Sequence, residues 1–213
     1  MQTRKLFLLS LVGLLLFVAG CGGGGGGGGG GGTSGGGGAT TIDPATAATV
    51  TGKVKFDGTA PKNDPIAMDA EPTCQEQYPN GATRETVLVN DNGTLQNVFV
   101  YVKKGLENYK FSPPAEGVVL DQKGCRYHPH VFGIMAGQEL IIRNSDGILH
   151  NIHPQPAVNK AFNLGQPVKM DSKKKFDQVE VMIPIKCDVH AWMSGYVGVL
   201  NHPYFAVTGT DGS

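Results

Sequence analysis

The sequence has no excess of charge of either sign, because 18 lysines and arginines stand against 18 aspartates and glutamates. Binding nucleic acid through a basic face needs clustered cations, so this balance argues against it. Long hydrophobic runs are also scarce. The only one lies in the first 20 residues, which excludes a polytopic membrane protein. Helical periodicity over ten or more residues is missing after that run, so the folded part is expected to consist of strands.

The amino end has the composition of an export signal. Arg4 and Lys5 precede an apolar run over residues 6–18, and small residues then lead into Cys21. This ending resembles the bacterial lipobox, in which the cysteine takes a lipid and becomes the first mature residue. An ordinary signal peptide, or a signal anchor that ends near a cysteine, is the alternative. We expect an exported lipoprotein, lipidated at Cys21 and facing the periplasm or the cell exterior.

Glycine dominates the next segment, where residues 22–32 are an unbroken run. Such a segment cannot bury enough apolar area to offset its ordering cost, so residues 22–48 are expected to form a flexible tether. Residues 39–213 contain 16 cations and 18 anions, a net charge of −2, and are long enough for one domain with a real core. We place a β domain at 49–207 and a short tail at 208–213.

The chain has four cysteines, and lipidation of Cys21 leaves three in an oxidising compartment. Cys74 and Cys125 both lie in turn-rich segments, and we predict a disulfide between them. Cys187 is then unpaired, which suggests another role for its thiol.

Short segments with strand-like composition follow one another after residue 49, separated by turn signals. Within residues 97–103, for example, three valines alternate with two aromatic residues. The expected strands are residues 49–56, 86–89, 97–103, 118–121, 139–143, 178–186 and 196–200. This spacing predicts an all-β fold, an antiparallel Greek-key sandwich or barrel with extra strands at its amino end.

The strand over residues 178–186 sets the direction of Cys187. Its alternation places Val179, Val181, Ile183 and Ile185 on one face, and Cys187 continues that face toward the core.

His190 and Met193 follow Cys187 within one short loop, and His150 is expected in a second loop, just past an upstream strand. Two imidazoles, a thiolate and a weak thioether suit copper as it changes oxidation state. Zinc prefers four strong ligands, and calcium and magnesium prefer oxygen. The proposed ligands of one copper ion are therefore His150, Cys187, His190 and Met193. Each of these residues could instead be structural, a buried thiol, a loop histidine or core packing.

At these residues the sequence resembles the cupredoxins, the small blue copper electron carriers. Residues 187–193 have the C-x2-H-x2-M spacing of the amicyanin type of ligand loop, and Asn151 matches a family asparagine that steadies the cysteine loop by hydrogen bonding. The resemblance covers about residues 139–200 and departs from the family at Val189, where proline is usual. The whole mature region also resembles bacterial secreted proteins described as methylamine-utilisation-like.

The resemblance implies one-electron transfer without catalysis, to a transient partner protein. The family's loop histidine, here His190, is implied to lie near the surface as the electron port, beside an apolar patch that includes Trp192. Three other classes stay open. They are an enzyme with Cys187 as nucleophile and His190 as base, a non-redox copper store or chaperone, and a β-sandwich binding or scaffold lipoprotein with an unused loop. We disfavour the enzyme because no orienting aspartate or asparagine is evident.

The remaining histidines have weaker claims to a metal. His153 is interpreted as a surface residue, although it is an alternative ligand. His128 and His130 form a possible second metal pair, but the intervening proline and the predicted disulfide favour a rigid loop. His202, before a proline, is interpreted as part of a turn.

Overall fold

The computed structural model of the protein describes residues 39–43 and 45–213. The predicted signal peptide, the lipidation site Cys21 and residues 22–38 of the predicted linker lie outside the described residues. The chain divides into two units, Met1–Gly36 and Gly37–Ser213, and the second contains all the elements described below. Within the described part of the chain, no helix is long and apolar enough to cross a membrane.

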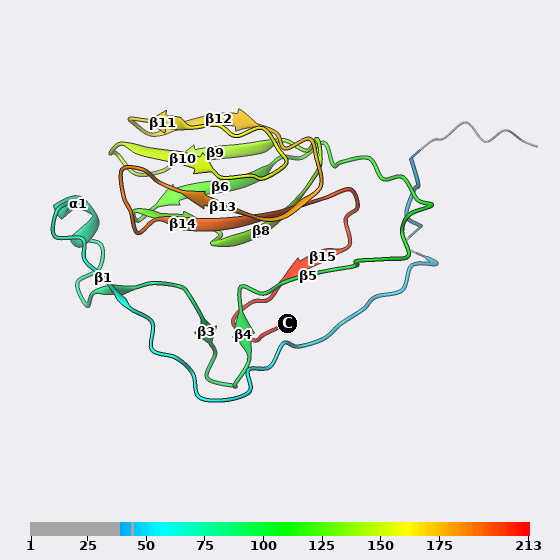
Figure 1. Ribbon diagram of the computed structural model, residues 1–213, viewed down its shortest axis with the longest axis horizontal. Helices are drawn as coiled ribbons and strands as arrows, with labels where there is room; N and C mark the ends of the chain where they lie inside the picture. The colour runs from blue at the N-terminus through cyan, green and yellow to red at the C-terminus, as the bar shows by residue number, and fades with distance from the viewer. Residues whose placement is uncertain (1–38, 44) are drawn as a thin grey trace, which may run out of the picture. The chain divides into compact units, whose positions relative to one another are not determined.

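Two larger sheets form the main part of the second unit (Figure 1). One has five strands in the order β11-β10-β13-β14-β8, and the other has four in the order β12-β9-β6-β7. The strands of the first are β8 (Val131–Met135), β10 (His150–Pro154), β11 (Leu164–Gln166), β13 (Glu180–Lys186) and β14 (Ser194–Leu200). Those of the second are β6 (Val118–Lys123), β7 (Arg126–His128), β9 (Leu140–Asn144) and β12 (Met170–Lys174).

Shorter elements occupy most of the chain before β6. They are β1 (Pro65–Ile66), α1 (Pro72–Gln75), β2 (Ala82–Thr83), β3 (Leu88–Val89), β4 (Leu95–Gln96) and β5 (Phe99–Tyr101). β1 pairs with β2 and β3 with β4, whereas β5 pairs with β15 (Phe205–Val207) near the other end of the chain. Of these elements, β3 and β5 lie within the expected strands at 86–89 and 97–103, whereas the other short strands were not expected.

The predicted all-β sandwich is confirmed, since strands predominate and most neighbouring strands are antiparallel. Two pairs are parallel, β8 with β14 and β6 with β9. The members of these pairs are well separated in sequence, because a parallel pair needs a crossover connection. No hairpin turn marks them, and the sequence therefore could not indicate their direction.

The two sheets enclose one apolar core. Leu120 and Ile142 of the four-stranded sheet and Ile152, Ile185 and Val197 of the five-stranded sheet are all 0–1% exposed. On the other side of the five-stranded sheet, the rings of Phe99 and Phe205 lie directly over Gly198 and Gly133. A Cβ at either glycine would overlap the ring above it, so glycine is what allows β5 and β15 to approach the sheet.

The predicted alternation in β13 holds only for its second half. Ile183, Ile185 and Cys187 are buried, but Val179 and Val181 are 47% and 39% exposed. The cause is a register shift between Glu180 and Ile183, the mark of a β-bulge. Because one inserted residue reverses the faces, the first half of the predicted inward face turns to solvent.

Three other segments differ from the sequence analysis. Residues 49–56 form only an isolated bridge, between Lys55 and Thr94. The expected loop around His150 is strand β10. The predicted tail at 208–213 is attached to the domain, since the Val54 N–H donates to the Gly212 carbonyl and Gly212 packs closely on Thr94.

Candidate metal centre

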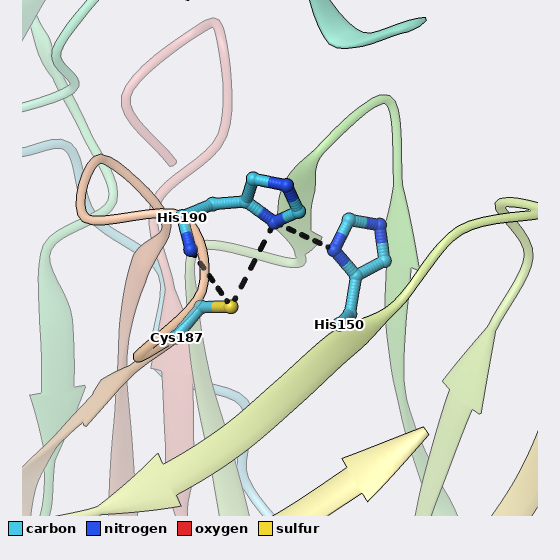
Figure 2. A group of neighbouring side chains, drawn as sticks. All are labelled: His150, Cys187 and His190. Atoms are coloured by element: carbon cyan, nitrogen blue, oxygen red, sulfur yellow. Dashed lines mark hydrogen bonds between the residues drawn. The ribbon is translucent and has the colours of Figure 1, made fainter. Parts of the chain in front are cut away.

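Three of the predicted ligands converge at one place between β10 and the loop after β13. His150 begins β10, Cys187 follows β13 directly and His190 lies in the loop, and all three are buried. Their ligand atoms lie within 4.8 Å of one another. Figure 2 shows the two rings turned toward each other, with Nδ1 of His150 3.0 Å from Nδ1 of His190 and the Cys187 sulfur below them. Residues 37 positions apart in the sequence thus face a common point.

The sulfur of Cys187 lies where backbone donors can stabilise negative charge. The N–H groups of His190 and Asn151 point at Sγ, at nitrogen–sulfur distances of 3.3 and 3.5 Å. Nδ1 of His190 is 3.8 Å from the same sulfur. Hydrogen bonds to an ionised group are stronger than those to a neutral one, so these donors are placed to support the sulfur of a metal-bound cysteine. The sulfur is only reachable from inside the site, because Cys187 is 2% exposed.

His150 is oriented by a carboxylate that the sequence analysis did not assign. Nε2 of His150 is 2.8 Å from Oδ2 of Asp146, and this leaves Nδ1 facing the site. The carboxylate is itself held by the backbone N–H groups of Gly124 and Cys125. Burial raises the pKa of Asp146, but these two donors and His150 outweigh it, and the pKa lies below its usual value. A carboxylate behind a ligand histidine fixes the ring and increases the basicity of its other nitrogen.

Asn151 contacts the loop that follows Cys187. Its Oδ1 accepts a hydrogen bond from the backbone N–H of Asp188, at 2.5 Å. The Asp188 carboxylate in turn bonds His153, Asn163 and Lys186. Burial raises the pKa of Asp188, but these partners outweigh burial and lower the pKa to about 2. The network ties β10 to the loop on the side away from the core, and it occupies Nδ1 of His153.

Met193 closes the loop and is 1% exposed. Its carbonyl accepts the Cys187 N–H at 3.2 Å and its own N–H donates to the His190 carbonyl, so the loop folds back on itself. The neighbouring Trp192 donates its indole N–H to the Cys125 carbonyl. Met193 therefore borders the three clustered residues, and its role as a ligand remains a prediction.

His190 is not at the surface, and the expected electron port is therefore corrected. The imidazole is 3% exposed. Its outer nitrogen, Nε2, faces Sγ of Cys74 at 3.9 Å and Oε2 of Glu71 at 4.0 Å. Burial lowers the pKa of His190, and the adjacent His150 ring lowers it further, so the ring is neutral at lower pH than an ordinary histidine.

The cover over His190 is a segment that the resemblance does not include. We call residues 64–83 the cap segment; it contains β1, α1 and β2. The structure contains the predicted Cys74–Cys125 disulfide, which joins α1 to the turn between β6 and β7. The Tyr78 hydroxyl also donates to the Gly124 carbonyl at 2.7 Å, and Arg126 donates to the Thr83 carbonyl. These bonds hold the cap segment against the outer edge of the His190 imidazole.

The other histidines contact separate parts of the chain. His128 bonds the Lys123 carbonyl and His130 the Ser194 carbonyl, and neither belongs to a group of three or more candidate metal ligands among the described residues. His202 is buried and accepts the Tyr204 N–H within a turn. Sequence reasoning missed Asp146 and Glu71. Asp146 is four residues before His150 in the same loop, a local signal that was present, whereas nothing in the sequence linked Glu71 to His190.

Comparisons with known proteins add a partial likeness in fold. No family model matches the sequence, and no curated protein does. A structure of an amicyanin mutant with Cu(I) is 19% identical, with a TM-score of 0.35 over 39% of this chain and 81% of that one. A reduced amicyanin mutant is 21% identical, with a TM-score of 0.36 over 41% and 91%. A copper-containing nitrite reductase from Thermus scotoductus SA-01 is 16% identical, with a TM-score of 0.38 over 47% and 25%. At these values the likeness assigns neither a family nor an activity, and nothing in it bears on the methylamine-utilisation resemblance.

Proposed function

We propose that the protein holds one copper ion at His150, Cys187 and His190, with Met193 as a weak fourth ligand, and carries single electrons. The observation that supports this most directly is the convergence of the three buried ligand atoms within 4.8 Å. Two imidazole nitrogens and a thiolate, with a thioether nearby, are the donors that suit copper in both oxidation states. A closed zinc site would use a stronger fourth ligand than a thioether.

The surrounding residues support this donor set. Two backbone N–H groups point at the Cys187 sulfur and would support a copper-bound thiolate, and Asp146 presents Nδ1 of His150 to the site. When bound, copper supplies a centre that accepts and releases one electron. The protein's part is to keep the ligands in one geometry through both states. Anchoring of His150 on β10 and of Cys187 at the end of β13 favours that rigidity.

The burial of Cys187 argues against the enzyme class. A catalytic nucleophile must reach a substrate, and the Cys187 side chain is almost fully enclosed. The structure does place an aspartate behind a histidine, which the sequence analysis did not foresee, but Asp146 orients His150 and not the proposed base His190. We therefore propose a binding and electron-transfer role without a catalytic residue.

The export signal and the lipobox-like ending at Cys21 support a membrane-tethered location outside the cytoplasm. In that location the glycine-rich segment would tether the copper domain to the membrane surface. A redox protein that meets the domain transiently would then be its partner. The balanced charge of the chain gives no basis for nucleic acid as a partner.

A non-redox copper-holding protein is a second candidate, and the cap segment favours it. With His190 covered by the cap segment, a metal in the site would be shielded from ligands in solution. Such a site would retain copper well and exchange electrons slowly. The two candidates differ in whether bound Cu(II) is reduced reversibly.

The test is to load the purified protein with one equivalent of Cu(II) and to record visible and electron-spin spectra during reduction and reoxidation. An intense thiolate-to-copper band that bleaches and returns is expected. Cys187→Ser removes the thiolate and abolishes the band. His153→Gln is the matched control, because His153 lies beside the site but bonds Asp188, and this variant keeps the band.

Copper that binds without the band, or a band that survives in Cys187→Ser, would contradict the proposed ligands. A band that does not bleach with reductant while copper stays bound would instead establish the copper-holding candidate.

A further inference from the structure

A pocket of about 650 Å³ lies beside the loop of residues 187–193 and is not used by the function proposed above. One side comes from Trp192, Met193 and Tyr196, and the facing side comes from residues 84–88 and 95–98, which precede the sandwich. Sites for small organic molecules usually have volumes of about 300–1,000 Å³ and mostly apolar walls with a few polar groups. The size and the lining of this pocket match that description.

The polar groups of the pocket carry a surplus of positive charge. Arg84, Arg126 and His130 line it, against Glu85 as the one acidic group among its described lining residues. Glu85 Oε2 is 3.4 Å from Nη1 of Arg126 and 3.5 Å from Nδ1 of His130, which are loose contacts for ion pairs. The charges therefore suit an anionic ligand.

One donor at this pocket has no acceptor. Nε of Arg126 is buried and has no hydrogen-bond partner among the described residues, although Nη2 of the same guanidinium donates to the Thr83 carbonyl. Buried donors in folded proteins are nearly always paired, because an unpaired one loses its hydration without compensation. Because Nε is itself enclosed, an anion in the pocket would meet this guanidinium through Nη1, which now lies 3.4 Å from Glu85.

The walls of the pocket also include strained backbone. Asn97 and Met182 both line it, and both have left-handed backbone conformations, with φ of 64° and 61°. This conformation is uncommon for asparagine and rarer for methionine, and such residues concentrate at functional sites. Met182 lies within the bulge of β13, which reverses the faces of the first half of that strand.

We propose that this pocket binds a small aromatic carboxylate, with its carboxylate at Arg126 and His130 and its ring against Trp192 and Tyr196. Aromatic side chains on the wall favour an aromatic ligand through stacked or edge contacts. The Trp192 ring lies 5.1 Å from the His190 ring, between their centroids, and Met193 itself lines the pocket, so the ligand would adjoin the proposed metal site. The pocket consists of protein side chains alone, and the ligand binds with or without a metal.

The test uses the purified protein with a chelator and no added metal, so that its result is independent of the proposed copper function. It is titrated with 2-naphthoate and with 2-naphthamide, which has the same shape but no charge. Calorimetry gives stoichiometry and affinity, and the emission of Trp192, the chain's single tryptophan, reports contact with the pocket wall. We expect saturable binding of one naphthoate with quenched emission, and at least ten-fold weaker binding of the amide.

Variants distinguish binding in the pocket from nonspecific binding elsewhere on the protein. Arg126→Gln weakens naphthoate binding about ten-fold or more and leaves amide binding unchanged. Arg84→Gln, at an exposed position on the rim, weakens naphthoate binding about three-fold. This second variant tests the proposal if Arg126→Gln does not fold. Arg143→Gln is the control, since Arg143 pairs with Asp171 on β9 and β12 and does not line the pocket. The proposal is overturned by absence of one-site binding, by equal binding of the two probes, or by an equal loss in the Arg143 variant.

Discussion

Removal of the Cys74–Cys125 disulfide is expected to uncover His190 while the sandwich stays folded. The bond links residues 51 apart in sequence. For a loop of that length, the chain-entropy model gives a loss of about 4 kcal/mol when the cross-link is removed. Domains of this size have free energies of unfolding of about 5–15 kcal/mol, so the double variant Cys74→Ser, Cys125→Ser is predicted to fold with a smaller margin.

The loss is expected to be concentrated in the cap segment. Two hydrogen bonds, from Tyr78 to the Gly124 carbonyl and from Arg126 to the Thr83 carbonyl, each contribute about 1 kcal/mol and would then hold it together with the buried side chains of Met68 and Ala82. Without the cross-link the segment is expected to open locally more often, while the strands of the two larger sheets keep their pairing. Urea unfolding of the variant measures the global loss, and access to His190 measures the local one.

Access is measured by the rate at which diethyl pyrocarbonate acylates each imidazole, followed by mass spectrometry. In the parent protein His190 and His202, which are 3% and 6% exposed, should react slowly, and His153 faster. In the double variant the rate at His190 should rise toward that of His153 while His202 stays slow. Tyr78→Phe, which loses one fastening hydrogen bond and keeps the disulfide, should give a smaller increase.

Two outcomes would refute this reasoning. If His190 stays as slow as in the parent protein after the disulfide is removed, the disulfide is not what holds the cap segment over the ring. If His190 and His202 accelerate together, the variant has opened globally and the cap segment is not a separate unit.

Two further predictions concern single carboxylates. Asp146→Asn leaves one acceptor for donors now held by two oxygens and weakens the orientation of His150, so we expect a loss of about 2 kcal/mol in urea unfolding and a higher reduction potential of bound copper by voltammetry. At Glu180, burial raises the pKa, but N–H donors from Asn159 and the two preceding residues lower it more, so the pKa is depressed. Stability from this group is complete above the unfolded pKa near 4.3 and is lost as pH falls through the folded value. Glu180→Gln should therefore lower stability at pH 7 by about 1 kcal/mol and flatten its decline in acid, and an unchanged decline would contradict the assignment.

The convergence of Cys187 with His190 was predictable because its determinants are local. Cys187 and His190 are three residues apart, and the parity of Ile183 and Ile185 correctly sends Cys187 inward. Counting left three cysteines, and the turn-rich segments around Cys74 and Cys125 indicated which two pair. The same parity failed for Val179 and Val181, because a bulge between Glu180 and Ile183 reverses the faces. Pro184 follows it directly and is a residue typical of bulges, but it does not give the position of the inserted residue.

Long-range packing explains the larger errors. The burial of His190 depends on a segment more than a hundred residues earlier in the chain, and only the folded structure brings Glu71 and Cys74 to its ring. The loop around His150 became strand β10 because it pairs with β11 and β13, which no propensity of its own residues requires.

The sandwich and residues 64–98 have different roles in the molecule. The sandwich supplies the converging ligands, from β10 and the loop after β13. Residues 64–98 control access to these ligands. The cap segment covers His190, and the residues after it form a wall of the pocket beside Trp192. Ile66 belongs to both, since it lies in β1 of the cap segment and lines the pocket. Opening the cap segment should therefore also disturb the pocket, and the double cysteine variant is expected to bind 2-naphthoate more weakly than the parent protein.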